Sequence, residues 1–299
     1  MGSTYAYRHA RRRRRPPSER DERLSGGARL GNGRPVELVS PREALLTLRP
    51  GDIALARLDV REDLAGAEEG LTILERLADA GVQVLNPPPA LLRAHDKLLT
   101  ARTLRRAGLP HPRTSIVERH AKLPDLDFPA VLKPRFGSWG RDVYLCRNRV
   151  ELERKVGQLA LRPWFRSGGA IAQELIPPLG HDLRVIVARG EVVGAAVRTA
   201  PPGEWRTNAA LGATVSPTTP APVAVSLAKA AASASGLDLV GIDLLPTGPG
   251  AFCVLELNGA VDFRPLYASP GRDVYADALS ALAGSMEAVA LDSAAADAG

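Results

Sequence analysis

The chain has 299 residues, enough for two modest domains, and 45% of them are apolar, so it can bury a sizeable core. Aromatic residues make up only 4%, which argues against a stacking platform for single-stranded nucleic acid. The net charge of +6 is unevenly distributed. Residues 1–35 hold 10 arginines and three acids, whereas the other 264 residues carry 29 basic and 30 acidic side chains. The basicity therefore belongs to the N-terminal segment. Because the rest of the chain is nearly neutral, nucleic acid is not a favoured partner for it.

The composition also excludes a membrane protein and a disulfide-stabilised scaffold. Cys146 and Cys253 are too few for a disulfide framework, lie in apolar runs, and are expected to be buried thiols in a reducing compartment. No run approaches 18 apolar residues, and the arginines at 11–15 precede prolines and polar residues instead of the apolar part of a signal peptide. We therefore expect a cytoplasmic protein.

The first third of the chain predicts a tail followed by a small β/α unit. Residues 1–35 are rich in Arg, Gly and Pro without periodicity, which predicts a disordered basic tail. A unit at 36–90 follows, small for an independent domain. Its expected elements are a strand at 36–39, a helix at 44–48, a strand at 53–58, a helix at 68–80 and a strand at 82–85.

A second, larger unit is expected at 91–288, and 289–299 is expected to be a C-terminal tail. Glycines and prolines separate its periodic segments. Helices are expected at 96–107, 150–161, 222–235 and 273–283. Strands are expected at 114–117, 130–133, 143–146, 171–176, 182–188, 192–198, 239–245 and 251–257.

Two neighbouring predicted strands near the C-terminal end carry oxygen ligands. Because side chains alternate along a strand, Glu256 and Asn258 project together, and Asp243 is the single acid of the preceding apolar strand. Two carboxylates and an amide oxygen suit an Mg²⁺ ion that also binds phosphates. An ordinary strand pair with solvent-facing polar residues would give the same pattern.

A lysine beside a glycine-rich turn provides a second indication of phosphate binding. The predicted strand at 130–133 delivers Lys133 next to Gly137-Ser138-Trp139-Gly140, where an ammonium and backbone N–H groups can reach phosphate oxygens. Only five of the 39 basic residues are lysines, so a lysine in a motif is informative. No Walker A sequence is present, and the glycines at 26–33 do not lie between a strand and a helix, which excludes P-loop and Rossmann folds. A surface hairpin with a chance lysine is the alternative.

The order of the motifs is more specific than any one of them. Nine segments occur in the order Asn86, His95-Asp96-Lys97, Val131-Leu132-Lys133, Gly137-Ser138-Trp139-Gly140, Gln173-Glu174-Leu175-Ile176, Asp182-Leu183-Arg184, Arg206-Thr207-Asn208, Gly241-Ile242-Asp243 and Leu255-Glu256-Leu257-Asn258. From about Leu85 to Ala283 the sequence resembles the ATP-grasp ligase superfamily, most closely its RimK-like branch of ribosomal-protein glutamate ligases and amino-acid ligases. The resemblance implies an α/β protein of α+β lobes with the ATP-grasp fold, a lid subdomain at about 112–175 and a truncated N-terminal β/α domain.

The resemblance also implies a role for each matching residue. ATP is expected between two lobes, with Gly137–Gly140 as a lid over its phosphates. The residues implied to bind ATP are Lys97, Lys133, Gly137, Ser138, Trp139, Gly140, Gln173, Glu174, Leu175 and Ile176. Asp243, Glu256 and Asn258 match the ligands of Mg²⁺, for which Mn²⁺ could substitute. Arg184, Arg198 and Asn208 match residues near the transferring phosphoryl group and the acceptor.

The implied activity is an ADP-forming, peptide-bond-forming carboxylate–amine ligase that acts through an acyl phosphate. Arg184, Arg198, Arg206 and Arg264 would give a cationic cleft, which favours an acidic amino acid, peptide or small metabolite as substrate. Alternatively, some of these arginines are solvated or paired with neighbouring acids. Other functions left open are an ATP-grasp phosphotransferase or kinase and a nucleic-acid-binding protein that uses the arginine tail. A homo-oligomer is also left open.

The sequence departs from the family pattern in three places. The first strand and helix of the N-terminal domain are expected to be missing or replaced by the tail. The lid loop continues with Arg141 and Asp142, where small or apolar residues are commoner. The segment 259–264 replaces the usual turn of small residues, proline and glycine after Asn258. His95 and His181 flank motifs and are expected to be structural or exposed.

Overall fold

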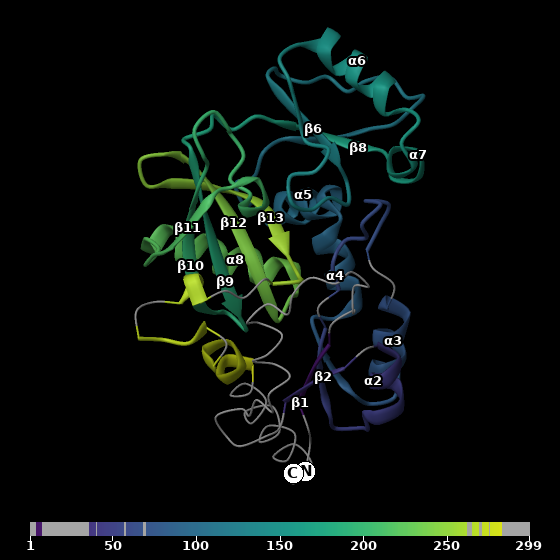
Figure 1. Ribbon diagram of the computed structural model, residues 1–299, viewed down its shortest axis with the longest axis vertical. Coiled ribbons are helices and arrows are strands. Elements are labelled where there is room, and N and C mark those ends of the chain that lie inside the picture. Colours follow the sequence, from purple (N-terminus) through teal and green to yellow (C-terminus); the bar gives the residue numbers. More distant parts are fainter. Residues whose placement is uncertain are drawn as a thin grey trace.

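Three sheets organise the described part of the chain, and each is built from one region of the sequence (Figure 1). The computed structural model describes residues 4–7, 36–39, 41–56, 58–67, 70–261, 265–268, 271–274 and 276–282. A four-stranded antiparallel sheet lies at the top of Figure 1, a five-stranded antiparallel sheet in the middle and a four-stranded parallel sheet at the bottom. We call them the lid sheet, the central sheet and the N-terminal sheet.

The N-terminal sheet has the strand order β2-β1-β3-β4, and all neighbouring strands are parallel. Its strands are β1 (Thr4–Tyr7), β2 (Val36–Val39), β3 (Ile53–Leu55) and β4 (Gln83–Leu85). Helices α2 (Pro41–Thr47) and α3 (Leu71–Asp79) accompany it, and α3 buries Leu74 and Leu77 on one face as the 3.6-residue period predicts.

Strand β1 differs from the expectation for the N-terminal segment. Thr4–Tyr7 pair with β2 and Thr4–Ala6 also pair with β3, so a strand lies within the segment predicted as a tail. Four residues, Thr-Tyr-Ala-Tyr, are too few to show a period within an arginine-rich composition. Residues 1–3 and 8–35, the remainder of the predicted tail, lie outside the described residues.

Two consecutive helices connect the N-terminal sheet to the lid sheet, where one was expected. Helix α4 (Pro88–His95) begins within the proline run that the sequence marks as a stop, with proline at its first helical positions. Helix α5 (Lys97–Arg106) follows directly. Asp96 separates the two helices and caps α5, accepting hydrogen bonds from the backbone N–H groups of Leu98 (3.0 Å) and Leu99 (3.3 Å).

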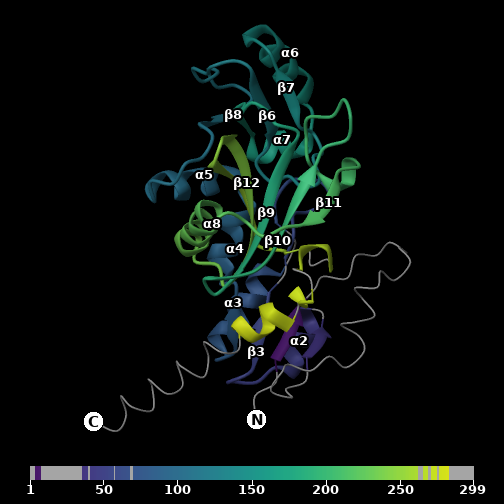
Figure 2. The ribbon, with the colours of Figure 1, turned by 90° about the vertical axis from the view of Figure 1, so that its left-hand side faces the viewer.

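The lid sheet has the strand order β5-β8-β6-β7 with antiparallel pairs throughout. Its strands are β5 (Thr114–Val117), β6 (Ala130–Pro134), β7 (Tyr144–Cys146) and β8 (Ala170–Glu174). Helices α6 (Arg149–Leu159) and α7 (Pro163–Gly168) accompany it (Figure 2). Leu152, Trp164 and Phe165 belong to the same buried cluster as Leu132 of β6.

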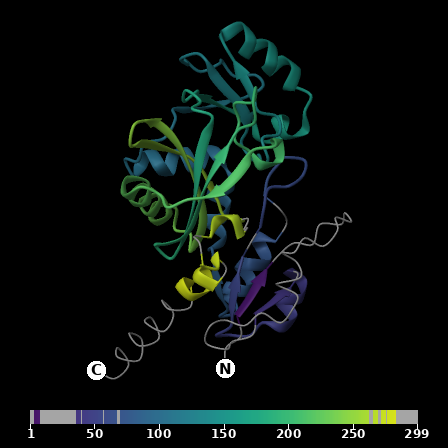
Figure 3. The same cartoon turned by 60° about the vertical axis from the view of Figure 1, so that its left-hand side comes forward.

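The central sheet has the strand order β11-β10-β9-β12-β13 and is antiparallel. Its strands are β9 (His181–Ala188), β10 (Glu191–Thr199), β11 (Thr214–Pro217), β12 (Leu239–Gly248) and β13 (Ala251–Asn258). Two 3₁₀ turns, η1 (Ala209–Leu211) and η2 (Pro265–Tyr267), lie beside it. Helix α8 (Pro222–Ser235) lies on one face of this sheet (Figure 3). Its small residues Ala224, Ala228 and Ala231 belong to the same buried cluster as Val185 of β9.

The N-terminal sheet shares its core with the central sheet. Leu55 and Leu85 of the former belong to the same buried cluster as Ile186 and Leu239 of the latter. Residues 276–282 are helical, as predicted, and Val274, Ala278 and Leu282 add to this cluster. The N-terminal unit is therefore packed as part of a larger body.

The structure bears on the two cysteines and on membrane-spanning helices, which the composition also addressed. Cys146 and Cys253 are free and buried, as predicted, and burial raises the pKa of Cys253 to about 11, which keeps its thiol protonated. Among the described residues, none of the helices combines the length and apolar character needed to cross a bilayer. Arg264 and 289–299 lie outside the described residues.

Candidate active site

Lys97 brings three distant parts of the sequence together. It begins α5, and its Nζ lies 2.9 Å from Glu256 Oε1 on β13 and donates a hydrogen bond of 2.5 Å to the carbonyl of Gly137. Gly137–Gly140, here called the glycine-rich loop, connects β6 to β7. A predicted ATP ligand, a predicted metal ligand and the predicted lid therefore meet at one ammonium group.

Lys133 lies on β6 and is buried, close enough to Glu256, Lys97 and Asp243 for their charges to affect it. Burial lowers the pKa of Lys133 to about 8, and Lys97 adds to the effect, whereas Glu256 and Asp243 oppose it. A buried ammonium with a lowered pKa is a group that an additional anion, such as a phosphate, would stabilise in its charged form.

The three predicted metal ligands lie at the paired ends of β12 and β13. The strand register places Asp243 directly opposite Glu256 and Gly241 opposite Asn258. Asn258 Nδ2 donates to the carbonyl of Gly241 (3.3 Å) and approaches Asp243 Oδ2 (3.5 Å). Two carboxylates and an amide on one face provide only hard oxygen donors, which fit a divalent ion of the Mg²⁺ type. The described residues contain no cluster of three or more His, Cys, Asp or Glu placed to hold a metal.

Two buried arginines surround Asp243. Arg184 of β9 makes a two-pronged contact with it, with Nη2 2.9 Å from Oδ2, and Arg198 of β10 lies 2.9 Å from the same oxygen. Arg198 Nε also donates to Asp182 (2.7 Å), which accepts a further bond from Thr207 (2.6 Å). Burial opposes ionisation, but the two guanidinium groups hold the pKa of Asp243 below its ordinary value. Both arginines are therefore engaged with carboxylates and do not point into an open cleft.

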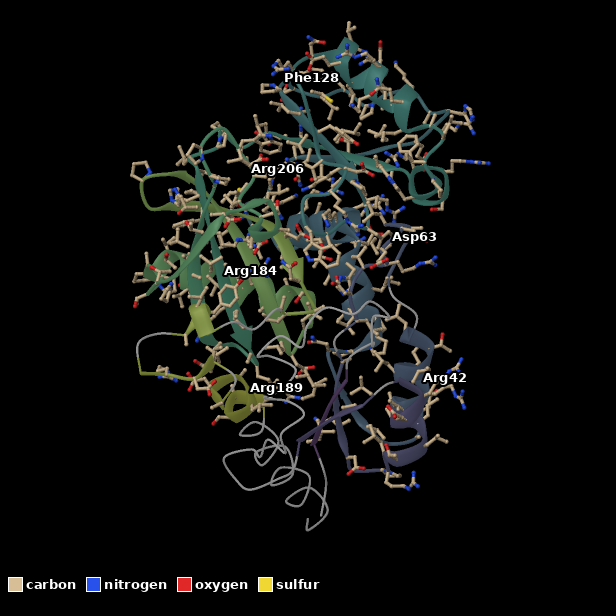
Figure 4. The ribbon with its side chains drawn as sticks, in the orientation of Figure 1. Arg42, Asp63, Phe128, Arg184, Arg189 and Arg206 are labelled. Carbon is tan, nitrogen blue, oxygen red and sulfur yellow. The ribbon has the colours of Figure 1, made fainter. Side chains whose placement is uncertain are left out.

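The glycine-rich loop is contacted by the segment between β10 and β11. Arg206 donates to the carbonyl of Gly140 (3.0 Å), and Glu204 fixes Arg206 through bonds of 3.0 and 2.7 Å. These bonds hold the pKa of the Glu204 carboxyl down at about 2. A side chain at Gly140 would lie 2.8 Å from Asn208 Oδ1, so the predicted Asn208 reaches the loop. Figure 4 shows Arg206 between the central sheet and the lid sheet, with Arg184 within the central sheet.

The unusual residues after the glycine-rich loop have structural roles. Asp142 adopts a left-handed conformation (φ 54°) and accepts hydrogen bonds from Tyr144 Oη (2.7 Å) and Trp164 Nε1 (3.0 Å). The guanidinium of Arg141 lies over the ring of Trp139 at 5.1 Å. Asp142 thus fixes the end of the loop to the lid sheet.

The segment 173–176, which the resemblance implies binds ATP, lies at the end of β8. Gln173 is buried and donates to Thr114 Oγ1 (2.9 Å), while Glu174 accepts from the backbone N–H of Arg113 (3.2 Å). The N–H of Leu175 donates to the carbonyl of Pro129 (3.3 Å), and Ile176 follows. These bonds hold the segment 173–176 against the starts of β5 and β6.

A small pocket of about 20 Å³ lies next to Lys97. It is lined by Asp59, Val60, His95, Lys97, Gly137, Ser138, Glu256, Asn258 and Ala260. Asp59 and His95 were not among the predicted site residues. The signal for Asp59 was its place directly after a buried parallel strand, since ligands bind at the carboxyl ends of such strands.

The arrangement of the two lobes defines the class of protein. Among solved structures, the D-alanine–D-alanine ligase of Bacillus anthracis in complex with ATP superposes with a TM-score of 0.69 at 14% identity. The match covers 98% of this chain and 100% of that one. The chain therefore has the ATP-grasp fold, as predicted, and this fold implies the use of ATP and a divalent metal ion.

The sequence comparisons give the family. Residues 94–281 match the RimK-like ATP-grasp domain. A probable alpha-L-glutamate ligase of Aeromonas salmonicida (strain A449) is 31% identical over 212 residues, which are 69% of this chain and 69% of that protein. Beta-citrylglutamate synthase B of Homo sapiens is 31% identical over 204 residues, 66% of this chain but only 52%, about half, of that protein. The chain belongs to the RimK-like ATP-grasp family, which confirms the predicted branch.

Proposed function

We propose that this protein is an ATP-dependent carboxylate–amine ligase that forms an amide, ADP and phosphate. The observation that carries the proposal is the position of Lys97 between Glu256 and the carbonyl of Gly137. Lys97 is implied to bind phosphate and Glu256 to bind the metal, and both lie beside the glycine-rich loop at one pocket. These are the groups that phosphoryl transfer requires, because its catalysis consists mainly of positioning and charge neutralisation.

The reaction has two steps. A substrate carboxylate oxygen attacks the γ-phosphorus of ATP, the bond to the bridging oxygen breaks, and ADP leaves with the electron pair. The amine then attacks the acyl carbon, the carbon–oxygen bond breaks, phosphate leaves, and the amine nitrogen loses a proton. Lys97 and Lys133 would neutralise the phosphates, and the glycine-rich loop would exclude water that hydrolyses an acyl phosphate.

Asp243, Glu256 and Asn258 would hold Mg²⁺, with Mn²⁺ as a substitute. When bound, the ion supplies charge neutralisation at the phosphates. Arg184 and Arg198 would act by holding Asp243 in position, because their guanidinium groups are committed to Asp182 and Asp243. Asn208, beside Gly140, would support the closed position of the loop.

An acidic substrate is supported by the names of the relatives. The bacterial relative is named as a probable alpha-L-glutamate ligase and the human relative as a beta-citrylglutamate synthase, so both names contain glutamate. We therefore propose L-glutamate as the amine and an acidic metabolite or peptide as the carboxylate.

The test uses hydroxylamine, an uncharged nucleophile at neutral pH that converts acyl phosphates to hydroxamates. The full chain is incubated with ATP, Mg²⁺, hydroxylamine and, in turn, citrate, N-acetyl-L-glutamate and a peptide ending in glutamate. Hydroxamate and ADP in equal amounts, and an amide when L-glutamate replaces hydroxylamine, are expected. A stable phosphorylated product would instead identify a phosphotransferase. Absence of both products with the whole panel would contradict the proposal.

A further inference from the structure

The two lysines assigned to the ATP phosphates come from different parts of the fold. Lys97 is the first residue of α5, which lies below the lid sheet in Figure 1, and Lys133 is on β6 of that sheet. Both are buried, and Lys97 is close enough to Lys133 to lower its pKa. Two ammonium groups repel each other at such a separation, so the fold must hold the segments that carry them together.

We propose that Asp96 and Arg135 form a positioning pair, which fixes Lys97 relative to Lys133 and so sets the geometry in which both lysines meet the phosphates of one nucleotide. The inference rests on the nucleotide binding that the proposed function includes, and it deepens that function. Both residues act through the lysines and are not themselves ligands of the nucleotide.

The Arg135 side chain connects Asp96 to the lid sheet through three nitrogens. Its Nε donates to Asp96 Oδ1 (3.2 Å) and its Nη2 to Asp96 Oδ2, while Nη1 donates to the carbonyl of Gly168 at the end of α7 (3.2 Å). The side chain of Asp96 is 2% exposed and that of Arg135 is 25% exposed. A two-pronged contact fixes the direction of a guanidinium as well as its distance, so this pair opposes rotation of the lid sheet against α5.

The backbone at the start of α5 completes the connection. N–H groups in the first turn of a helix have no partner within the helix. Asp96 accepts hydrogen bonds from those of Leu98 (3.0 Å) and Leu99 (3.3 Å). The carbonyl of Arg135 accepts the N–H of Lys97 (3.1 Å). Lys97 is thereby held through its backbone, whatever its ammonium group contacts.

The charge of Asp96 can be removed without removing the helix cap. Oδ1 serves the cap, whereas Oδ2 contacts Arg135. In Asp96→Asn the amide oxygen keeps the cap, because asparagine caps helices as well as aspartate does. The amide nitrogen takes the place of Oδ2 and meets the Nη2 donor of Arg135, so the two-pronged contact is lost.

The experiment titrates a non-hydrolysable ATP analogue into the full chain by calorimetry. We expect Asp96→Asn to weaken binding about 10-fold, as for loss of one charge-assisted hydrogen bond. Arg135→Gln, which leaves the Asp96 cap in place, should weaken it by a similar factor. In a Lys97→Met background, Asp96→Asn should weaken binding less than about twofold further, because the pair acts through the position of Lys97. A residue that only maintained the fold would weaken binding equally in both backgrounds.

Glu153→Gln is the matched control. Glu153 is an exposed acid of α6 that pairs with Arg149 at 3.1 Å, so the substitution also removes one carboxylate charge from an ion pair. It should leave the affinity for the ATP analogue unchanged.

The outcomes separate the inference from the proposed function. Unchanged binding in Asp96→Asn would overturn the inference, and so would equal losses with and without Lys97. Hydroxamate formation by the unmodified protein together with either result would leave the ligase function standing. If the unmodified protein binds the analogue but forms no hydroxamate, the ligase function fails, and the titrations still decide whether the pair positions the lysines. If it does not bind the analogue, both fail.

Discussion

Lys133 is buried on β6 in the midst of the candidate site, where burial lowers its pKa to about 8. A lysine binds phosphate only in its protonated form, so the affinity for ATP should be constant below this pKa and decrease above it. Beyond pH 8 the protonated fraction falls about tenfold per pH unit, and the affinity should fall by up to that factor. Calorimetric titration with a non-hydrolysable ATP analogue from about pH 7.5 to 9.5 measures this dependence.

The control for the pH experiment is Lys133→Arg. A guanidinium stays charged throughout this range, so the variant should show a flat pH profile whatever its absolute affinity. A profile for the unmodified protein that is as flat as that of the variant would mean that Lys133 does not bind the nucleotide.

Lys97 and the arginines neutralise the charge of the predicted metal ligands Glu256 and Asp243. Glu256 pairs with Lys97, and Asp243 lies between Arg184 and Arg198. A divalent cation without nucleotide must therefore compete with protein cations, and we expect weak Mn²⁺ binding to the nucleotide-free protein. Lys97→Met should strengthen this binding about tenfold or more, because it frees the Glu256 carboxylate. Electron paramagnetic resonance of free Mn²⁺ measures it without turnover.

The exposed pair of Lys229 with Glu191 (3.2 Å) provides the control for Lys97. Lys229→Met removes the same charge from the whole protein but lies away from the site, and it should leave Mn²⁺ binding unchanged. Equal Mn²⁺ affinities for Lys97→Met and Lys229→Met would contradict the competition between Lys97 and the metal.

At the scale of the elements, the position of the glycine-rich loop depends on the left-handed backbone conformation of Gly140. Gly140 has φ 69°, and an added Cβ would lie 2.8 Å from Asn208 Oδ1 and 3.0 Å from Leu211 Cδ1. Gly140→Ala should therefore displace the loop from the segment between β10 and β11, with about 1–2 kcal/mol lost from the free energy of unfolding. The KM for ATP should rise. Urea denaturation and steady-state kinetics measure the two effects.

The same substitution at Gly157 is expected to have the opposite effect on the free energy of unfolding. It lies within α6, and nothing stands within 4 Å of a Cβ added there. Gly157→Ala should raise the free energy of unfolding by about 0.5–1 kcal/mol and leave kinetics unchanged, because alanine is the better helix former. A similar loss of stability in both variants would mean that the Gly140 effect is not caused by its conformation.

Most elements could be predicted from sequence, including short strands such as β2 and β5, whereas β1, α4, α7 and β11 could not. Helices α3, α5, α6 and α8 and strands β9, β10, β12 and β13 lie where the patterns place them, within a few residues. Helix α4 was missed because prolines usually stop a helix, yet Pro88 and Pro89 occupy its first turn, where the missing N–H is harmless. Helix α7 and strand β11 are too short to show a period.

The candidate site was predictable as a set of residues but not as a set of contacts. Strand alternation was enough to place Glu256 and Asn258 on one face. Nothing local could show that Arg184 and Arg198 are committed to Asp243 and Asp182, because these pairings depend on the register of three strands. Asp59 was missed for a related reason, since only the packing of the N-terminal sheet on the central sheet brings it to β13.

At the scale of the whole molecule, Asn86 joins the N-terminal sheet to the central sheet. Its side chain accepts from the N–H of Leu239 (2.8 Å) and donates to the carbonyls of Leu239 (2.8 Å) and Gly259 (3.2 Å). Its own N–H donates to Asp238 (2.9 Å), and its φ of 56° is a conformation that asparagine tolerates well. One side chain thus ties the end of β4 to the start of β12 and to the residue after Asn258.

Asn86→Ala should therefore lower the free energy of unfolding by about 3 kcal/mol or more, since it leaves three buried backbone groups without partners. Urea denaturation measures the change. Asn148→Ala is the matched control: Asn148 accepts one bond from the N–H of Glu151 (2.9 Å) as the exposed cap of α6, and its loss should cost about 1 kcal/mol. If the two variants lose the same stability, the sheets are held together by their shared apolar core and not by Asn86. If Asn86→Ala loses more, its KM for ATP should rise as well, because Gly259 directly follows the β13 end that carries Glu256 and Asn258.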